Sequence, residues 1–414
     1  MAQGFAGLSI LSNDVGFKDS ANLDAFSRLR VSNPATLFDA QQTYNLNPLL
    51  FESITSGSGA SVAHDATNGA ALFTFSSTPT TGKAYQQSYE YIRYQPSKSQ
   101  LAFVTFNFIE SVTDVLKFAG YSDGSNGFEF QNDGTNNQFK IYSTSSNGDQ
   151  TVTQSNWNLD KLDGTGSSGI TLDITKTQIL IIDFQALYAG RVRMGFDING
   201  VIIYCHEFLH ANIVSTPYIY TANLPVRCGM TCTATVSTTM RFICCAVVSE
   251  GGMDETIGYE FAQEGTATAA SGARTHVLSI RPKLLFNGLT NRTKMAFIEV
   301  NALVTGNNPI YWELVLGQAI SGTTTFNDVN STYSGMEYNT AGTISGSPAI
   351  VVDSGYVAAS NQSKGAEGRV LTSRYPITLD AAGAVRALGT ISIIATGIGA
   401  SSAMRVAGKF KEIR

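Results

Sequence analysis

The chain has 414 residues, of which 43% are hydrophobic and only 14% are charged, and its formal net charge is −5. A chain of this length is longer than a domain with one hydrophobic core usually is, so we expect two or three domains. Lys and Arg form no extended cluster, which argues against a nucleic-acid-binding surface. We expect neither a signal peptide nor a membrane helix, because the most apolar stretch, between Arg386 and Arg405, is interrupted by Gly and Thr and predicts strand–turn–strand.

In chain order, residues 1–40 are predicted to form an extended N-terminal arm, because helical periodicity is weak and Asn33 precedes Pro34. Residues 41–250 read as many short strands separated by Gly, Asn and Asp, which predicts a large antiparallel β-sandwich of the jelly-roll or concanavalin-like type. Residues 251–273 are rich in Gly, Ala and Thr and are predicted to be a linker. Residues 274–414 are predicted to form a smaller β-sandwich. The expected fold class is therefore mainly β.

Four strands are predicted from alternation and from one turn signal. Residues 101–108 place Ala102, Val104, Phe106 and Phe108 on one face. Residues 191–198 and 201–208 are joined by Asn199-Gly200, a strong hairpin signal that sets Ile198 opposite Val201 and Arg193 opposite His206. Residues 295–302 place Ala296, Ile298, Val300 and Ala302 on one face.

Five cysteines occur, at positions 205, 228, 232, 244 and 245. An odd number without a secretion signal argues against a disulfide framework, and no CxxC pair is present for zinc. We therefore predict small buried side chains in strands, in a protein made in a reducing cytoplasm. No cofactor and no metal are expected.

One motif resembles an enzyme signature, since His206-Glu207-Phe208-Leu209-His210 satisfies HExxH. Zinc chelation by this motif requires a helix, whereas the hairpin places it on a strand, where the two His residues are ~13 Å apart. A metalloprotease acting through His206, Glu207 and His210 is thus only a remote alternative, and we predict that the chain is not an enzyme.

Turn-rich segments also carry scattered acidic residues, namely Asp123, Asp133, Asp160, Asp163, Asp173 and Asp183. Such carboxylates could hold calcium beside a sugar site, but Asp is equally what turns require. Trp157 and the tyrosines of residues 85–94 could form a binding platform, although an interface role is the favoured interpretation.

Three stretches together resemble a family of virion structural proteins of large tailed bacteriophages and some large DNA viruses. They are residues 157–185 (WNLDKLDGTGSSGITLDITKTQILIIDFQ), 24–52 and 91–108, and the resemblance spans roughly residues 20–250. Ser97 departs from the family pattern, which has Gly within the run Tyr-Gln-Pro-Gly-Lys-Ser. The resemblance implies a structural component of the virus particle: a capsid-decoration, vertex, head-fibre or tail protein.

Its expected partners are copies of itself, as a trimer or pentamer, and other virion proteins, without nucleic acid or membrane. Its expected location is the virion, after synthesis in the host cytoplasm. The predicted assembly interface lies in the arm and comprises Phe26, Arg28, Leu29, Arg30, Leu37 and Phe38. The alternative is a host-surface adhesin whose concanavalin-like sandwich binds a glycan.

Overall fold

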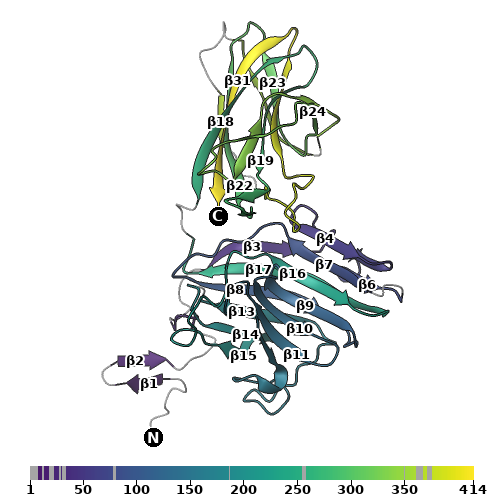
Figure 1. Ribbon diagram of the computed structural model, residues 1–414, viewed down its shortest axis with the longest axis vertical. Helices are drawn as coiled ribbons and strands as arrows, with labels where there is room; N and C mark the ends of the chain where they lie inside the picture. Colours follow the sequence, from purple (N-terminus) through teal and green to yellow (C-terminus); the bar gives the residue numbers. More distant parts are fainter. Residues whose placement is uncertain are drawn as a thin grey trace. The chain divides into compact units, whose positions relative to one another are not determined.

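The computed structural model describes residues 8–11, 14–17, 23–27, 29, 34–77, 81–185, 187–253, 258–348, 350–359, 367–370 and 375–414, with the backbone alone at 8–11, 14–17 and 367–370. These residues divide into two compact units built of antiparallel strands (Figure 1). Unit 1 comprises Met1–Ser88 and Ile92–Glu255, and unit 2 comprises Tyr89–Tyr91 and Thr256–Arg414. The predicted fold class, mainly β with two antiparallel sandwiches, is confirmed. No helix in the described ranges is long and apolar enough to cross a membrane.

Unit 1 is a sandwich of two sheets. The seven-stranded sheet has the order β12 (Gln150–Thr153), β11 (Asn137–Tyr142), β10 (Gly127–Asn132), β9 (Val115–Ser122), β16 (Val226–Cys232), β7 (Gly82–Ser88), β4 (Phe51–Ser56). The eight-stranded sheet has the order β15 (Val201–Phe208), β14 (Val192–Ile198), β13 (Gln178–Phe184), β8 (Ser99–Asn107), β17 (Thr238–Glu250), β6 (Ala70–Phe75), β5 (Ala60–Asp65), and β3 (Ala35–Gln41) also pairs with β17. A single 3-10 turn, η1 (Gln154–Asn156), follows β12.

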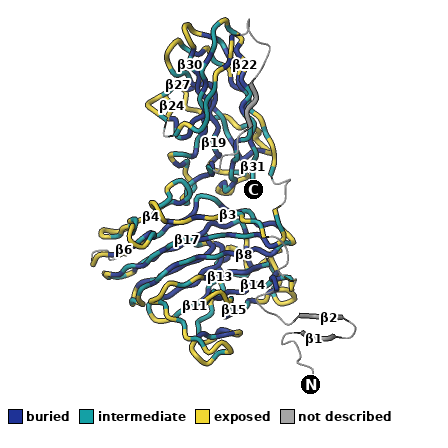
Figure 2. The backbone as a smooth tube through the Cα atoms, turned by 180° about the vertical axis from the view of Figure 1, so that it is seen from behind, coloured by how far each residue is buried: buried dark blue, intermediate teal, exposed yellow. Residues whose placement is uncertain are grey.

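The core of unit 1 lies between these sheets and is dominated by Phe side chains such as Phe106, Phe128 and Phe130. Alternate residues of each strand enter this core, as the sequence of residues 101–108 predicted for Ala102, Val104, Phe106 and Phe108. Figure 2 shows buried residues along the strands and exposed residues mainly at the turns that join them. The residues between the core positions therefore form the two outer faces of the sandwich.

The predicted hairpin at Asn199-Gly200 is present, with both residues at positive φ and Ile198 opposite Val201. The register further along was predicted wrongly, because a β-bulge between Met194 and Gly195 shifts it by one residue. His206 consequently lies opposite Met194, and Arg193 lies opposite Glu207.

Unit 2 also contains two main sheets around its own core. The four-stranded sheet has the order β18 (Tyr259–Ala269), β31 (Ser402–Ile413), β22 (Lys294–Val304), β29 (Glu367–Val370). The six-stranded sheet has the order β25 (Asn327–Asp328), β26 (Met336–Asn339), β19 (Thr275–Pro282), β30 (Ile391–Gly397), β23 (Ile310–Leu316), β28 (Ile350–Val357). Two small ribbons pair β20 (Leu285–Phe286) with β21 (Leu289–Thr290), and β24 (Ile320–Gly322) with β27 (Gly342–Ile344).

The predicted linker at residues 251–273 is wrong over much of its length. Residues Tyr259–Ala269 form β18, which pairs with β31 along its whole length. β18 has a neighbour on one side only and most of its residues are exposed or half-buried, so polar Thr, Gln and Glu are tolerated there and the apolar alternation is lost.

The prediction that one face of residues 295–302 points into the core is partly wrong, because the strand contains a β-bulge. The register of β22 shifts between Phe297 and Glu299, so Met295 and Phe297 are buried before the shift, and Val300 and Ala302 after it. Ala296 and Ile298, which the alternation assigned to the core face, are only half-buried.

The predicted arm at residues 1–40 ends earlier than expected, since β3 is part of the eight-stranded sheet. Before it, β1 (Leu8–Leu11) and β2 (Asp14–Phe17) pair with each other. Leu23 and Ala25 are buried in unit 1.

Candidate binding faces of unit 1

The predicted assembly residues fall into three groups. Phe38 is 5% exposed in the core of unit 1, so the prediction for it is wrong, whereas Leu37 is half-buried against the same core and its interface role stays a prediction. Phe26 is half-buried, whereas Leu29 is 41% exposed. Arg28 and Arg30 lie outside the described residues.

The segment around Leu23 is held by a buried ion pair on the outer face of the eight-stranded sheet. Arg193 is 2.6 Å from the Asp183 carboxylate, and the two side chains are 1% and 0% exposed. Arg193 also donates to the Leu23 carbonyl at 2.6 Å. Asp183 accepts from Ser99 at 2.9 Å and from Tyr204 at 2.7 Å. Asp183 was expected in a turn-rich segment, but it is buried in β13, as Arg193 is in β14.

The HExxH residues form no zinc site. His206 lies on β15, and its Nδ1 accepts from the Asn158 backbone N–H at 3.2 Å. His210 lies beyond the strand, and its Nδ1 donates a hydrogen bond to the Gly190 carbonyl at 2.7 Å. Glu207 lies 3.6 Å from Arg191 in an ion pair. Burial lowers the pKa of His206 to about 4, so both rings serve as neutral packing and hydrogen-bonding groups.

The acidic residues of the loops cap their own turns. Asp160 accepts from the Leu162 and Ser168 backbone N–H groups at 2.9 and 2.7 Å, and from the Ser167 hydroxyl at 3.1 Å. Burial by itself raises the pKa of Asp160, but these hydrogen bonds outweigh it, so the pKa lies below its usual range. Asp123, Asp133, Asp163 and Asp173 likewise accept from residues two or three positions ahead. Within the described residues, no group of three or more His, Cys, Asp and Glu side chains could hold a metal ion.

The outer face of the seven-stranded sheet carries two rows of side chains that cross all seven strands. The strand register gives the first row as Glu52, Gln87, Arg227, Gly120, Glu129, Lys140 and Thr151. The second row is Ile54, Tyr85, Gly229, Phe118, Gln131, Gln138 and Thr153. We call these rows, together with Ser122 and Tyr142, the polar strip.

Glu129 is the centre of a hydrogen-bond network in the polar strip. Its side chain is fully buried, accepts from Ser122 at 2.5 Å and from Gln131 at 2.7 Å, and lies 3.3 Å from Arg227. Gln131 also donates to the Tyr142 hydroxyl at 2.8 Å. Burial, and then the charge of Glu129, raise the pKa of Tyr142 above its usual value, so this phenol stays neutral. The buried carboxylate thus fixes the side chains around it.

Aromatic rings and glycines shape the same strip. The Arg227 guanidinium lies 4.5 Å from the ring centres of both Tyr85 and Phe118, which are in the second row. Gly229 stands between these two rings in the register, and a Cβ there would lie 2.2 Å from the Tyr85 Cβ. Glycine therefore allows the rings to approach the sheet. Tyr85 was within the predicted aromatic platform, whereas Trp157 is 2% exposed and stacks on Phe139 in the core.

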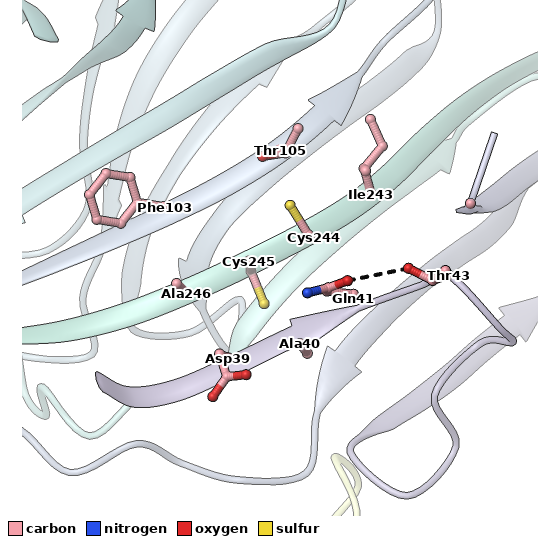
Figure 3. Close-up of a pocket in the computed structure, with 11 residues that line it drawn as sticks. Asp39, Ala40, Gln41, Thr43, Phe103, Thr105, Ile243, Cys244, Cys245 and Ala246 are labelled. Carbon is pink, nitrogen blue, oxygen red and sulfur yellow. Dashed lines mark hydrogen bonds between the residues drawn. The ribbon is translucent and has the colours of Figure 1, made fainter. Parts of the chain in front are cut away.

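A second candidate lies on the outer face of the eight-stranded sheet, where one row crosses five strands: Gln41, Cys244, Thr105, Ile179 and Asp197. A hollow of about 340 Å³ lies over β3, β17 and β8 (Figure 3), and another of about 380 Å³ lies over β8, β13 and β14. Thr105 lines both, so we call the combined depression the five-strand groove.

The cysteines follow the predicted pattern of buried strand residues with one exception. All five are free, and Cys205, Cys228, Cys232 and Cys245 are buried. Cys244 is half-buried because it faces the five-strand groove, as Figure 3 shows.

No protein-family model matches the sequence, and no curated protein matches it. Among solved structures, an endo-1,3-beta-glucanase from Streptomyces sioyaensis matches 53% of this chain and 97% of its own, with 11% identity and a TM-score of 0.38. A carbohydrate esterase from the Shiga toxin-encoding bacteriophage phi24B matches 52% of this chain and 99% of its own, with 12% identity and a TM-score of 0.31. The binding domain of botulinum neurotoxin DC matches 66% and 75%, with 10% identity and a TM-score of 0.33. These likenesses assign no function to this chain.

The same comparison corrects the prediction that the chain is not an enzyme. The matched structures include the endo-1,3-beta-glucanase and a glycoside hydrolase family protein from Mycobacterium thermorestibile.

Proposed function

We propose that unit 1 is a glycan-binding module and that the polar strip is its binding face. The observation that carries this proposal is the set of half-exposed rings and polar groups fixed around the buried Glu129. Sugars present C–H faces that pack on aromatic rings and hydroxyls that exchange hydrogen bonds with amides, phenols and charged groups. Tyr85 and Tyr142 supply the rings, and Gln138, which donates to Gln131 at 2.9 Å, supplies an amide.

The charges of the strip favour an uncharged sugar. Arg227 is paired with Glu129, and Lys140 lies 3.1 Å from Asp149 and 4.1 Å from the centre of the Tyr142 ring. Because each cation has an anion beside it, a carboxylated or sulfated glycan gains no free positive charge here. The network also holds its members in place before a ligand arrives, which lowers the entropic cost of binding.

The test is binding of the full chain to an array of immobilised bacterial surface polysaccharides, followed by titration calorimetry with the best oligosaccharide. Tyr85→Ala should weaken binding at least tenfold, equivalent to about 1.4 kcal/mol. Tyr356→Ala is the matched control, since this Tyr is 70% exposed on β28 of unit 2. Equal affinities for Tyr85→Ala and wild type would overturn the proposal. Chromatography of the glycan after incubation reports whether it is also cleaved.

We further propose that this module belongs to a virus particle, as the family resemblance implies. The three resembling stretches contain β3, β8 and β13, which all lie in the eight-stranded sheet. Ser97, which stands where the family pattern has Gly, has a φ of +70°, the region that favours Gly, so the turn is kept despite the substitution. Immunogold labelling of particles purified from the organism that encodes the chain should decorate them. Unlabelled particles, with the protein found only in the particle-free lysate, would contradict it.

A further inference from the structure

We propose that the five-strand groove receives residues 26–31 of a second copy of this chain. The proposal does not rest on glycan binding, because the groove and the polar strip lie on opposite outer faces of the unit 1 sandwich.

The dimensions of the groove suit a short extended segment. It crosses five strands, and four spacings of ~4.8 Å give a length of ~19 Å. An extended chain that rises ~3.3 Å per residue needs about six residues to cover this distance. The two hollows, of about 340 and 380 Å³, provide room for apolar side chains along the way.

The lining is apolar with acidic margins. Phe103, Ile179 and Ile243 contribute apolar surface, and the carboxylates are those of Asp39, Asp173 and Asp197. No Lys or Arg lines either hollow among the described residues. Asp173 and Asp197 accept from Thr175 and from the Gly200 backbone N–H in their own turns, and neither forms an ion pair with a described residue. The groove therefore complements a segment that combines apolar and cationic side chains.

The chain contains such a segment at residues 26–31, Phe-Ser-Arg-Leu-Arg-Val. Alternation in an extended strand sets Leu29 and Val31 on one face, and the long side chains of Arg28 and Arg30 can reach carboxylates at the margins. Leu29 is 41% exposed in its own chain. Similar basic and apolar alternations at residues 191–194 and 405–411 fall largely within the paired strands β14 and β31.

Leu29 is held in its own chain away from the row that the groove follows. Leu29 forms an isolated bridge with Leu23, whose carbonyl is bound by Arg193. After the segment in the chain, Thr36 of β3 lies in the same row across the sheet as Arg193. The paired residues between them in this row are Val248, Leu101 and Asp183. The groove follows the row of Thr105 and Ile179, four residues further along β8 and β13, which corresponds to ~13 Å. A neighbouring copy can present this segment without releasing either end.

Exchange between two charge-reversed variants tests the proposal. Arg28→Glu with Arg30→Glu alters the segment, and Asp173→Lys with Asp197→Lys alters the groove. In sedimentation equilibrium of the full chain, each double variant alone should associate at least tenfold more weakly than wild type. An equimolar mixture should regain association, because each mixed pair joins an unaltered groove to an unaltered segment. Arg405→Glu, at a position 63% exposed on β31, is the control for a change of surface charge and should associate as wild type.

A wild-type chain that stays monomeric at high concentration would overturn the proposal, and so would variants that associate as wild type. A mixture that stays monomeric would also overturn it, since contact between copies is then not what the substitutions disturb. Cys244 gives an independent readout, because it is the half-buried thiol that lines the groove. Its alkylation by iodoacetamide, followed by mass spectrometry, should slow severalfold as wild-type concentration rises and should not slow in the Arg28→Glu, Arg30→Glu variant. Circular dichroism melting curves show whether each variant is folded.

Discussion

Replacement of Arg193 by Met should strongly destabilise unit 1. The change removes the cation from a carboxylate that is 0% exposed and removes the donor from the Leu23 carbonyl, both at 2.6 Å. Asp183 keeps Ser99 and Tyr204 as donors, but its buried charge loses the Arg193 guanidinium beside it. The loss of a hydrogen bond between two charged groups and the loss of a donor to a buried carbonyl together cost about 3–5 kcal/mol, which is the range for breaking a buried ion pair.

Urea unfolding followed by circular dichroism measures this loss. With a slope of about 3 kcal/mol per molar urea, the midpoint of the unit 1 transition should fall by about 1–1.7 M. Trypsin should also cleave faster at Arg28 and Arg30, because the segment before them loses its anchor. The variant Asp183→Asn with Arg193→Met has no buried charge at this place and should lose less than Arg193→Met alone. A midpoint within about 0.3 M of wild type for Arg193→Met would refute the reasoning, and so would a double variant that is as unstable as the single one.

Three further outcomes are expected. The pKa of His206 is about 4 in the folded state and ~6.5 in the unfolded state, so the unfolded state binds more protons between these pH values. The free energy of unfolding should therefore fall by about 2–3 kcal/mol as the pH drops from 6.5 to 4. Urea titrations at several pH values should show this dependence in the wild type and its loss in His206→Phe. Lys117→Met should lower the free energy of unfolding by about 2–4 kcal/mol in the same assay, because the Lys117 ammonium donates to three backbone carbonyls and to the Thr238 hydroxyl inside the sandwich. Lys117→Arg keeps a cation at this position and should lose less stability. Equimolar zinc should leave the melting temperature unchanged, and stoichiometric zinc measured by mass spectrometry after dialysis would contradict the separate roles assigned to His206 and His210.

The sequence predicted strands well wherever apolar residues alternate regularly and a tight turn fixes the end. Residues 101–108 and the hairpin at Asn199-Gly200 are found as expected. The predictions failed at single-residue irregularities, since the extra residues Cys205 and Ile298 at the two bulges exchange the faces of the residues beyond them. A bulge depends on how two strands fit together, and the sequence of one strand carries little sign of it.

The strand at residues 259–269 was not predicted from its composition for a different reason. Apolar alternation reports burial rather than strand conformation, and β18 has only one neighbouring strand and few buried residues. Its pairing with β31 joins segments about 140 residues apart, as in the ion pair of Glu264 with Arg405 at 3.2 Å. Such a strand is recognisable only once its partner is known.

The polar strip shows why the candidate site was missed while the fold was not. Each of its strands contributes one or two polar residues at positions that alternation marks only as outward, and no short motif brings them together. Arg227 and Glu129 are 98 positions apart, and they meet because β16 and β10 both pair with β9. A Glu within a run of buried strand residues was nevertheless visible in the sequence around Phe128 and Phe130. Because a buried carboxylate is costly without partners, its presence in such a strand implies a complementary Arg and amide from elsewhere in the sheet, and searching for them is how such a face can be found from sequence.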